Sequence, residues 1–408
     1  MPKKYRILIF ACAAVYIAAY VGRLSYSASM VGILNATGAT KADAGLVTTF
    51  FYVTYGCGQL INAFLCRYYK PRPVIAGVLI VSALSNLLIF LIRDVTVVKF
   101  VWLVNGAVQS MLWCTLIELL SRRLPKEHMA KATVAMSATA AVGTTLAYGI
   151  SALCVALDCW PLTFFVAAAF LLLAGGVWIF VMTQVERARA GGALEEDDTP
   201  VRSVPESGTP VRKSRAFLWA LVLIGATAIA NGFIKDGVNN WLPKLLHDEF
   251  GVADSLSIIL TLLLPVFSVF GAVFARRVYL KLQNHLRING IFYTTAFVLA
   301  LGVYLFYPMR STLLTMGFFI GLACMMAAIN NVITSMVPLD NRDKMDSGLL
   351  AGLLDTLCYV GSTAAGTLLG VLSQSWGWDS VLITLTVLAG VAALLSISFS
   401  FIRKREKG

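Results

Sequence analysis

The sequence consists largely of long apolar runs, each about the length that a helix needs to cross a lipid bilayer. A helical crossing takes roughly 20 mostly apolar residues, and the runs near 7–34 and 216–246 are longer than that. Of the 408 residues, 58% are hydrophobic and only 13% are charged, so little sequence remains for a water-soluble domain. We therefore expect an all-α integral membrane protein with about twelve transmembrane helices.

The expected helices form two sets on either side of a polar segment. They lie near 7–34, 42–66, 73–93, 96–121, 130–156 and 161–184, and near 216–246, 253–280, 285–307, 311–337, 346–372 and 377–402. The segment between them is acidic and then proline-rich, a composition that cannot bury enough apolar surface to fold. We interpret the chain as an N-terminal six-helix half (1–185), a flexible cytoplasmic linker (186–215) and a pseudo-symmetric C-terminal six-helix half (216–408).

The net charge of +12 is unevenly distributed. Positive residues cluster after the even-numbered expected helices: Arg67, Lys70, Arg72, Arg122, Arg123, Lys126, Lys131, Arg276, Arg277, Lys281, Arg287, Arg403, Lys404, Arg405 and Lys407. The alternate loops carry far fewer, which predicts that both termini are cytoplasmic. The bias explains the charge without nucleic acid, so the expected partner is the lipid bilayer and the expected location is the cell (inner) membrane.

Two cations interrupt otherwise apolar runs. Arg23 lies in the first expected helix of the first half, and Lys235 lies at a matching depth in the first expected helix of the second half. A cation near the bilayer midplane costs roughly 2.5–3.5 kcal/mol on insertion scales, so it normally faces a cavity or a partner. Equivalent helices that supply equivalent cations suggest a shared anionic ligand between the halves.

The residues around Arg23 favour phosphate as that anion. Tyr16, Tyr20, Arg23 and Ser27 have the spacing of one helical face. A guanidinium framed by phenol hydroxyls suits phosphate because it is planar, always charged and able to donate two parallel hydrogen bonds. The alternative is a structural ion pair between Arg23 and a buried carboxylate.

Other expected helices carry polar residues on single faces. These are Tyr52, Tyr55, Gln59 and Asn62; Asn231, Lys235 and Asn239; Asn330, Asn331 and Thr334; and Asp355, Tyr359 and Ser362. Together they describe a wet cavity, although each could instead form a helix–helix hydrogen bond. We take Tyr16, Tyr20, Arg23, Tyr55, Gln59, Lys235, Asn239, Asp355 and Tyr359 as the candidate substrate-binding residues.

Three acidic residues need separate interpretation. Asp355 could be a proton-linked carboxylate, a counter-ion for Lys235 in the empty site, or part of a structural bridge. Asp236 is adjacent to Lys235 but is rotated about 100° from it on a helix, so we expect the two not to face each other. Glu118 lies one turn before Arg122, and we expect an interfacial ion pair there.

No enzymatic motif is present in the sequence. It has no phosphate-binding glycine loop, no HExxH and no Gly-x-Ser-x-Gly. The cysteines lack metal-ligand spacing. Cys154 and Cys159 flank a short turn and could pair, the alternative being that they are small apolar filler. We therefore expect no catalytic residue, no metal and no cofactor.

Several motifs occur in an order that resembles one family. They are Tyr16, Tyr20 and Arg23; Gly106-Ala-Val-Gln109-Ser-Met111-Leu-Trp113; Asn240-Trp241-Leu-Pro243; Tyr55 and Tyr359; and Trp376-Gly377-Trp378-Asp379. With them the chain resembles the organophosphate:phosphate antiporters of the major facilitator superfamily, which include glycerol-3-phosphate and hexose-phosphate transporters. The resemblance implies the major facilitator fold, a monomer, and two cations, Arg23 and Lys235, that grip phosphate. It also implies rocker-switch exchange of an organic phosphate for inorganic phosphate.

The chain departs from that family's pattern at several positions. Gln59 stands where a Lys occurs in well-known members, Ala140 where a His occurs, Leu24 and Asn240 where a Lys and an Asp occur, and Cys66 where the superfamily has an aspartate. The second cation is Lys where bacterial members often carry Arg, which replaces a planar fork with a point charge. Two other functions share these features: a membrane sensor that binds the phosphorylated metabolite without moving it, and a proton-coupled carrier of another organic anion.

Overall fold

The computed structural model describes residues 3–190, 215–282, 284–341, 345 and 347–405. Within these residues, helices joined by short connections make up the chain, and there is no strand among them. Eleven helices are long and apolar enough to cross a membrane. α2 (Lys41–Leu65) has 25 residues but is not among the eleven, because its threonine, tyrosine, glutamine and asparagine residues lower its hydropathy. The expected all-α membrane fold is confirmed.

The first half has one helix for each expected crossing. Besides α2, its elements are α1 (Lys3–Thr37), η1 (Cys66–Tyr68), α3 (Pro71–Ile92), α4 (Val95–Arg123), α5 (Lys126–Ala156) and α6 (Leu162–Ala190). Short capped turns join several of them. Thr40 accepts a hydrogen bond from the backbone N–H of Asp43 at the start of α2, and Asp94 accepts one from Thr96 at the start of α4. Such caps satisfy amide groups that a helix start leaves unpaired.

Two expected crossings of the second half are interrupted. Its elements are α7 (Arg215–Phe250), α8 (Asp254–Thr261), α9 (Leu263–Leu282), α10 (His285–Phe306), η2 (Tyr307–Met309), α11 (Thr312–Asn331), the π-helical η3 (Val332–Met336), α12 (Val337–Asp340), α13 (Ser347–Ser375) and α14 (Gly377–Arg405). Proline explains both interruptions. Pro265 follows the end of α8 and Pro338 follows the π-helical turn, and a proline removes a helical hydrogen bond and crowds the carbonyl four residues earlier.

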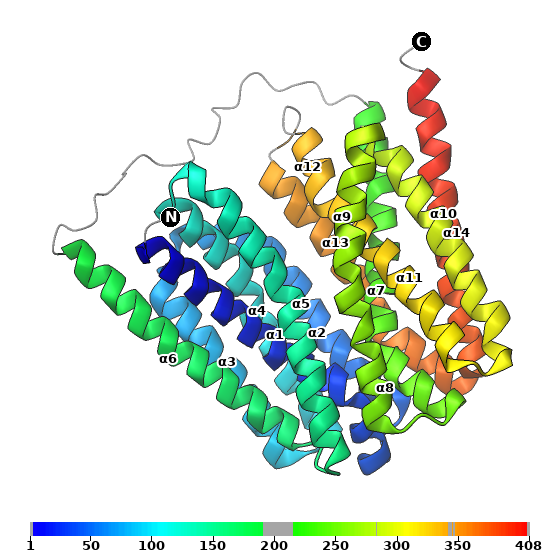
Figure 1. The fold of residues 1–408 in the computed structure, drawn as a ribbon, viewed down its shortest axis with the longest axis horizontal. Coiled ribbons are helices and arrows are strands. Elements are labelled where there is room, and N and C mark those ends of the chain that lie inside the picture. Colours follow the sequence, from blue (N-terminus) through cyan, green and yellow to red (C-terminus); the bar gives the residue numbers. More distant parts are fainter. Residues whose placement is uncertain (1–2, 191–214, 283, 342–344, 346, 406–408) are drawn as a thin grey trace.

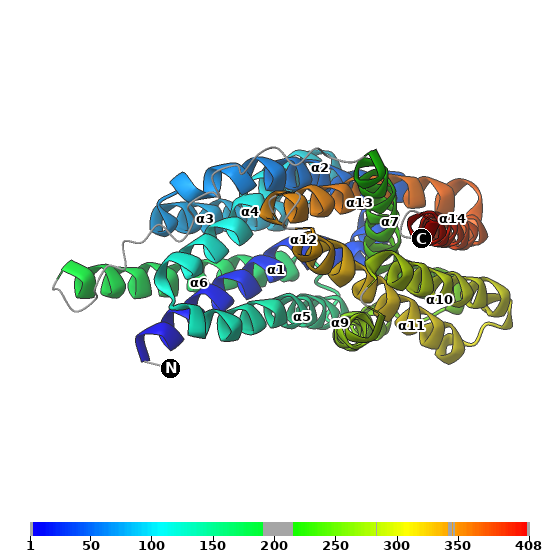
Figure 2. The same cartoon turned by 90° about the horizontal axis from the view of Figure 1, so that it is seen from above.

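The two halves lie together at one end of the molecule and diverge toward the other (Figure 1). α2 packs against α13, and α5 packs against α8 and α9. In the view from above, α2 lies beside α13 and α5 beside α9, with α1 and α7 between these pairs (Figure 2). Both termini lie at the diverging end (Figure 1), and we call the opposite end, where α1 ends and α2 begins, the outer end. Most of the expected linker, residues 191–214, lies outside the described residues.

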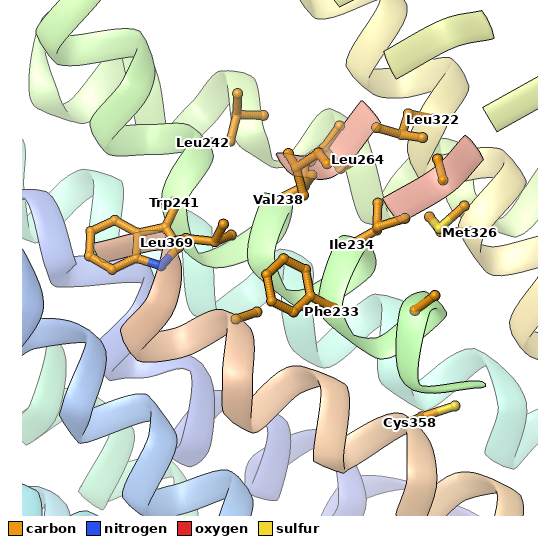
Figure 3. Packing of buried hydrophobic residues seen from close by; sticks show 14 of the residues in the cluster. Phe233, Ile234, Val238, Trp241, Leu242, Leu264, Leu322, Met326, Cys358 and Leu369 are labelled. Carbon is orange, nitrogen blue, oxygen red and sulfur yellow. The ribbon is translucent and has the colours of Figure 1, made fainter. Parts of the chain in front are cut away.

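α7 is apolar on one side and polar on another. Ile234, Val238 and Trp241 are almost fully buried and face side chains of neighbouring helices such as Leu264, Met326 and Leu369 (Figure 3). Their spacing is that of a helical stripe. Because this stripe anchors α7 in its own half, the polar side of the helix is held at a fixed position between the halves.

Close contact between α7 and α13 depends on glycine. A Cβ atom on Gly232 would overlap the backbone carbonyl of Cys358, and one on Gly361 would overlap that of Ile229. A backbone carbonyl cannot move away as a flexible side chain can. We expect Gly232→Ala to destabilise the protein by about 1–3 kcal/mol, the usual effect of overpacking.

The test is the apparent Tm of the purified protein in detergent. It is measured as the temperature at which the monodisperse size-exclusion peak is lost. Gly317→Ala in α11 is the matched control, because a Cβ there meets nothing within 4 Å. It should melt at or slightly above the wild-type Tm, since alanine favours helix. Equal Tm values for Gly232→Ala and the wild type would show that the helices can separate without loss.

Candidate substrate-binding site

Arg23 lies among aromatic rings supplied by three helices. Its guanidinium carbon is 3.7 Å from the ring centroid of Tyr20 and 5.3 Å from that of Tyr55. Tyr16 lies edge-on to Tyr20 at 5.2 Å and contacts Trp113 of α4 at 5.0 Å. Aromatic faces attract a cation within about 6 Å of the ring. The rings therefore hold the guanidinium in place without neutralising its charge.

No carboxylate forms a salt bridge with Arg23 in the part of the chain that the structure describes. The alternative in which Arg23 belongs to a structural ion pair is therefore not found. A half-buried arginine with no such ion pair keeps the guanidinium N–H groups that are not directed at the Tyr55 hydroxyl available for a ligand. Bidentate donation to phosphate or carboxylate is the recognition to which this group is best suited.

An aromatic contact beside Arg23 joins the two halves. It is formed by Tyr55 of α2, which is held by Gln59, and by Tyr359 of α13. Gln59 Nε2 donates a hydrogen bond of 3.1 Å to the Tyr55 hydroxyl. Tyr55 contacts Tyr359 of α13 edge-on at 4.9 Å, and Tyr52 stacks on Tyr359 at 6.1 Å. Tyr52 was absent from the candidate list, although its position one turn before Tyr55 was a signal for including it.

Lys235 has a neighbour that the sequence argument excluded. Its Nζ lies 3.7 Å from Asp236 Oδ1, so the expectation that the two side chains do not face each other was wrong. The angle between adjacent Cα–Cβ bonds does not fix the end of a four-carbon side chain, which bends toward the carboxylate. Ser362 Oγ donates to the other oxygen, Asp236 Oδ2, at 2.5 Å. The Lys235 side chain remains 30% exposed, which leaves its ammonium accessible.

Asp355 is subject to the charges of three other site residues, Lys235, Asp236 and Arg23. The carboxylate of Asp355 lies in the electrostatic field of all three, and Lys235 also interacts electrostatically with Tyr20 of the first half. Both cations thus face a common region between α1, α2, α7 and α13. Among the described residues Asp355 forms neither a hydrogen bond nor a salt bridge.

Several other polar residues are used in helix packing. Asn231 donates to Asn330 Oδ1 at 3.0 Å, and Asn62 donates to Ser110 Oγ at 2.9 Å. Asn239 reaches the first half through its backbone, because the hydroxyl of Tyr148 donates to its carbonyl oxygen at 2.9 Å. For Asn231 and Asn62 the helix–helix alternative describes the structure, and the substrate contact of the Asn239 side chain stays a prediction.

A polar network closes the outer end. We call it the outer network, and it consists of Asn35, Lys41, Lys244, His247, Asp248 and Asp254. Asp248 Oδ2 lies 2.7 Å from Lys41 Nζ, and Asp248 Oδ1 lies 3.0 Å from Lys244 Nζ. Asn35 accepts from Lys244 at 3.0 Å and donates to Asp254 at 2.8 Å.

The outer network ties α1 and α2 to α7 and α8. His247 Nδ1 lies 2.6 Å from Asp254 Oδ1, a further ion pair when the imidazole is protonated. No sequence motif marks this network, because its members lie at the ends of four separate helices. Lys41, for example, lies between two expected helices, and its position in the sequence does not indicate a partner on α7.

The expected Glu118–Arg122 ion pair and the possible Cys154–Cys159 pair have clear outcomes. Arg122 and Glu118 form the expected ion pair, at 2.9 Å. All eight cysteines are free, so Cys154 and Cys159 do not pair. Within the described residues no group of three or more His, Cys, Asp or Glu side chains could hold a metal ion.

Comparison with known proteins identifies the superfamily of this chain and a group of relatives within it. The sequence profile of the Major Facilitator Superfamily matches residues 12–345, so the chain belongs to this superfamily of membrane transporters. It is not an enzyme. Within the superfamily it resembles the organophosphate:phosphate antiporters, as the motifs predicted.

The relatives are distant but span nearly the whole chain. A "Probable hexose phosphate transport protein" of Chlamydia muridarum is 21% identical, over 93% of this chain and 87% of that protein. The "Membrane sensor protein UhpC" of Escherichia coli is 20% identical, over 93% of this chain and 88% of that protein.

Solved structures share the fold. A bacterial homologue of the human lysosomal transporter Spinster has a TM-score of 0.77 at 14% identity and covers 98% of both chains. A D-xylose–proton symporter has a TM-score of 0.73 at 12% identity and covers 97% of this chain and 98% of its own.

Proposed function

We propose that this protein is a secondary active transporter that exchanges an organic phosphate, such as a sugar phosphate or glycerol phosphate, for inorganic phosphate. The observation that carries the proposal is Arg23, a membrane-embedded cation with no ion pair to any residue that the structure describes, which faces the same region as Lys235 of the other half. A phosphate monoester carries a charge of about −1.5 to −2 at pH 7. It is therefore the anion that two cations can attract most strongly.

Exchange follows from the charges of the empty and the loaded carrier. Without substrate, Arg23 and Lys235 repel each other across the cleft in a medium of low dielectric constant, and Asp236 beside Lys235 offsets part of this repulsion. A bound phosphate removes this repulsion and draws the halves together. Because the ligand favours the closed arrangement, it shifts the conformational population toward reorientation. The unloaded carrier reorients slowly, which makes transport an exchange.

The observed conformation fits one stage of a rocker-switch cycle. The outer network holds the halves together at the outer end, whereas they diverge at the end with the termini (Figure 1). We infer that the termini are cytoplasmic, so that the site opens to the cytoplasm in this conformation. We also infer two six-helix halves, 1–185 and 216–408, with residues 186–215 as their linker, and a monomer in the cell (inner) membrane.

Opening of the outer end must break the outer network. Asp248 accepts from Lys41, Lys244 and the indole N–H of Trp378. Hydrogen bonds to a charged group contribute about 1.5–3 kcal/mol each when partly buried. We therefore expect Asp248→Asn to increase the outward-open population roughly tenfold, since a factor of ten corresponds to about 1.4 kcal/mol.

Spin labels at Leu157 and Leu313, which are exposed near the outer end of each half, measure this change by double electron–electron resonance in a cysteine-depleted background. Asp94→Asn is the matched control, because Asp94 caps α4 and contacts only its own half. The longer interlabel distance should gain population in Asp248→Asn alone. An unchanged distribution would mean that the outer network does not hold this end closed.

Proteoliposomes test the proposed function directly. Purified protein is reconstituted, the vesicles are loaded with inorganic phosphate or left empty, and entry of labelled phosphate is followed. We expect rapid entry only into loaded vesicles, with inhibition by glycerol 3-phosphate or glucose 6-phosphate. Binding without entry would instead support the sensor function suggested by the resemblance to UhpC. Entry into empty vesicles driven by a pH gradient would support proton coupling.

A further inference from the structure

The charges of the candidate site favour an organic phosphate that also carries a positive charge. Arg23 and Lys235 are the cations, and Asp236 and Asp355 are carboxylates in the same electrostatic environment. With all four ionised, the site is neutral before substrate arrives. A phosphate ester would then bring about −1.5 to −2 into a membrane-embedded site without compensation.

The two carboxylates differ in their partners. Asp236 is held by Ser362 and lies beside Lys235, so its charge is already matched. Asp355 is half-buried and, among the described residues, has neither a hydrogen bond nor a salt bridge. A buried charge is normally paired, and Asp355, like Arg23, makes no direct ion pair with a described residue.

Aromatic rings surround the same region. Asp355 lies one helical turn before Tyr359 on α13, and the ring of Tyr359 lies 4.9 Å from that of Tyr55. Tyr52 stacks on Tyr359 at 6.1 Å. A carboxylate beside several aromatic faces is the arrangement that recognises an organic ammonium ion, because both the charge and the ring quadrupoles attract a cation.

We propose that the organic phosphate bound here carries an alkylammonium group, with its phosphate between Arg23 and Lys235 and its ammonium at Asp355 and the adjoining tyrosines. This inference rests on the proposed function and specifies its substrate class. The ammonium charge offsets part of the phosphate charge, so the loaded site is closer to neutral than with an uncharged ester. Each end of the substrate also meets groups of opposite charge.

Two phosphate esters of nearly equal size separate this inference from the simpler one. 2-Aminoethyl phosphate and 2-hydroxyethyl phosphate differ only in an ammonium or a hydroxyl at the far end. Each is added as an inhibitor of labelled phosphate exchange in proteoliposomes. For the wild type, we expect the aminoethyl ester to inhibit at an about tenfold lower concentration, the effect of one charge-assisted contact.

Asp355→Asn keeps the shape of the side chain and removes its charge. The ratio of the two half-inhibitory concentrations should fall to about one in this variant, and a ratio does not depend on how much exchange the variant retains. If the variant exchanges too slowly, the same ratio is obtained from thermal stabilisation of the purified protein by each ester. Asp236→Asn is the control and should keep the preference, since Asp236 is matched by Lys235 and Ser362.

The outcomes are distinct. Equal inhibition of the wild type by the two esters, with phosphate exchange intact, overturns this inference and leaves the proposed function in place. A preference that persists in Asp355→Asn overturns the role assigned to Asp355. Absence of both phosphate exchange and phosphate binding in the wild type overturns the proposed function itself.

Discussion

Arg23→Gln is expected to reduce phosphate exchange at least a hundredfold, because truncation of one partner of a buried charge pair commonly costs about 2–5 kcal/mol. The variant leaves Lys235 as the sole cation at the phosphate, and Lys235 is partly compensated by Asp236. Arg23→Lys should lose less, since it keeps the charge but loses the planar pair of donors. Labelled phosphate counterflow in proteoliposomes gives both rates.

The control for this prediction is Arg93→Gln. Arg93 lies at an exposed helix end, where its side chain contacts only the carbonyl oxygen of Phe90. Its replacement by glutamine is the same chemical change outside the candidate site. Both variants should elute as monodisperse protein in detergent, because the Arg23 guanidinium contacts rings rather than a carboxylate. Exchange by Arg23→Gln at the rate of the Arg93→Gln control would remove Arg23 from the site.

Lys235→Gln is the second variant with a large expected effect. It should lower exchange by more than about thirtyfold, at the lower end of the same cost range. It also leaves the carboxylates of Asp236 and Asp355 without a nearby ammonium, so the apparent Tm should fall as well. Lys235→Arg should retain exchange, since an arginine supplies the same charge with better geometry for phosphate.

A double variant separates the structural and the substrate role of Lys235. Lys235→Gln combined with Asp236→Asn removes the ion pair as a whole, so the Tm should return toward that of the wild type. Exchange should stay low because the phosphate still lacks its second cation. Recovery of both properties would mean that Lys235 serves only to neutralise Asp236, and Lys70→Gln at an exposed position is the control for surface charge.

The fold could be predicted because a bilayer imposes strong constraints on sequence. Apolar runs of spanning length had to become helices, and they did. The break between α8 and α9 was less visible, since the surrounding residues are uniformly apolar and Pro265 alone indicates it. α2 was predicted despite its lower hydropathy because its polar residues follow a helical period. Tyr52 and Tyr55 contact Tyr359 of α13, whereas Asn62 forms a hydrogen bond with Ser110 of α4.

The candidate site could be predicted only where local spacing determines it. Tyr16, Tyr20 and Arg23 belong to one helix, so their spacing was enough to bring them together. Pairs from different helices, such as Asn231 with Asn330, depend on which helices pack together and at what height. The outer network depends on four helix ends at once. The Lys235–Asp236 contact depended on a flexible side chain rather than on helical geometry.

The central claim is that one phosphate contacts Arg23 and Lys235 at the same time. Solid-state NMR tests it through the ³¹P–¹⁵N dipolar coupling between bound phosphate and protein labelled with ¹⁵N on arginine and lysine side chains. We predict coupling to one guanidinium and one ammonium, with the first signal lost in Arg23→Gln and the second in Lys235→Gln. Bound phosphate whose couplings survive both substitutions would contradict the claim.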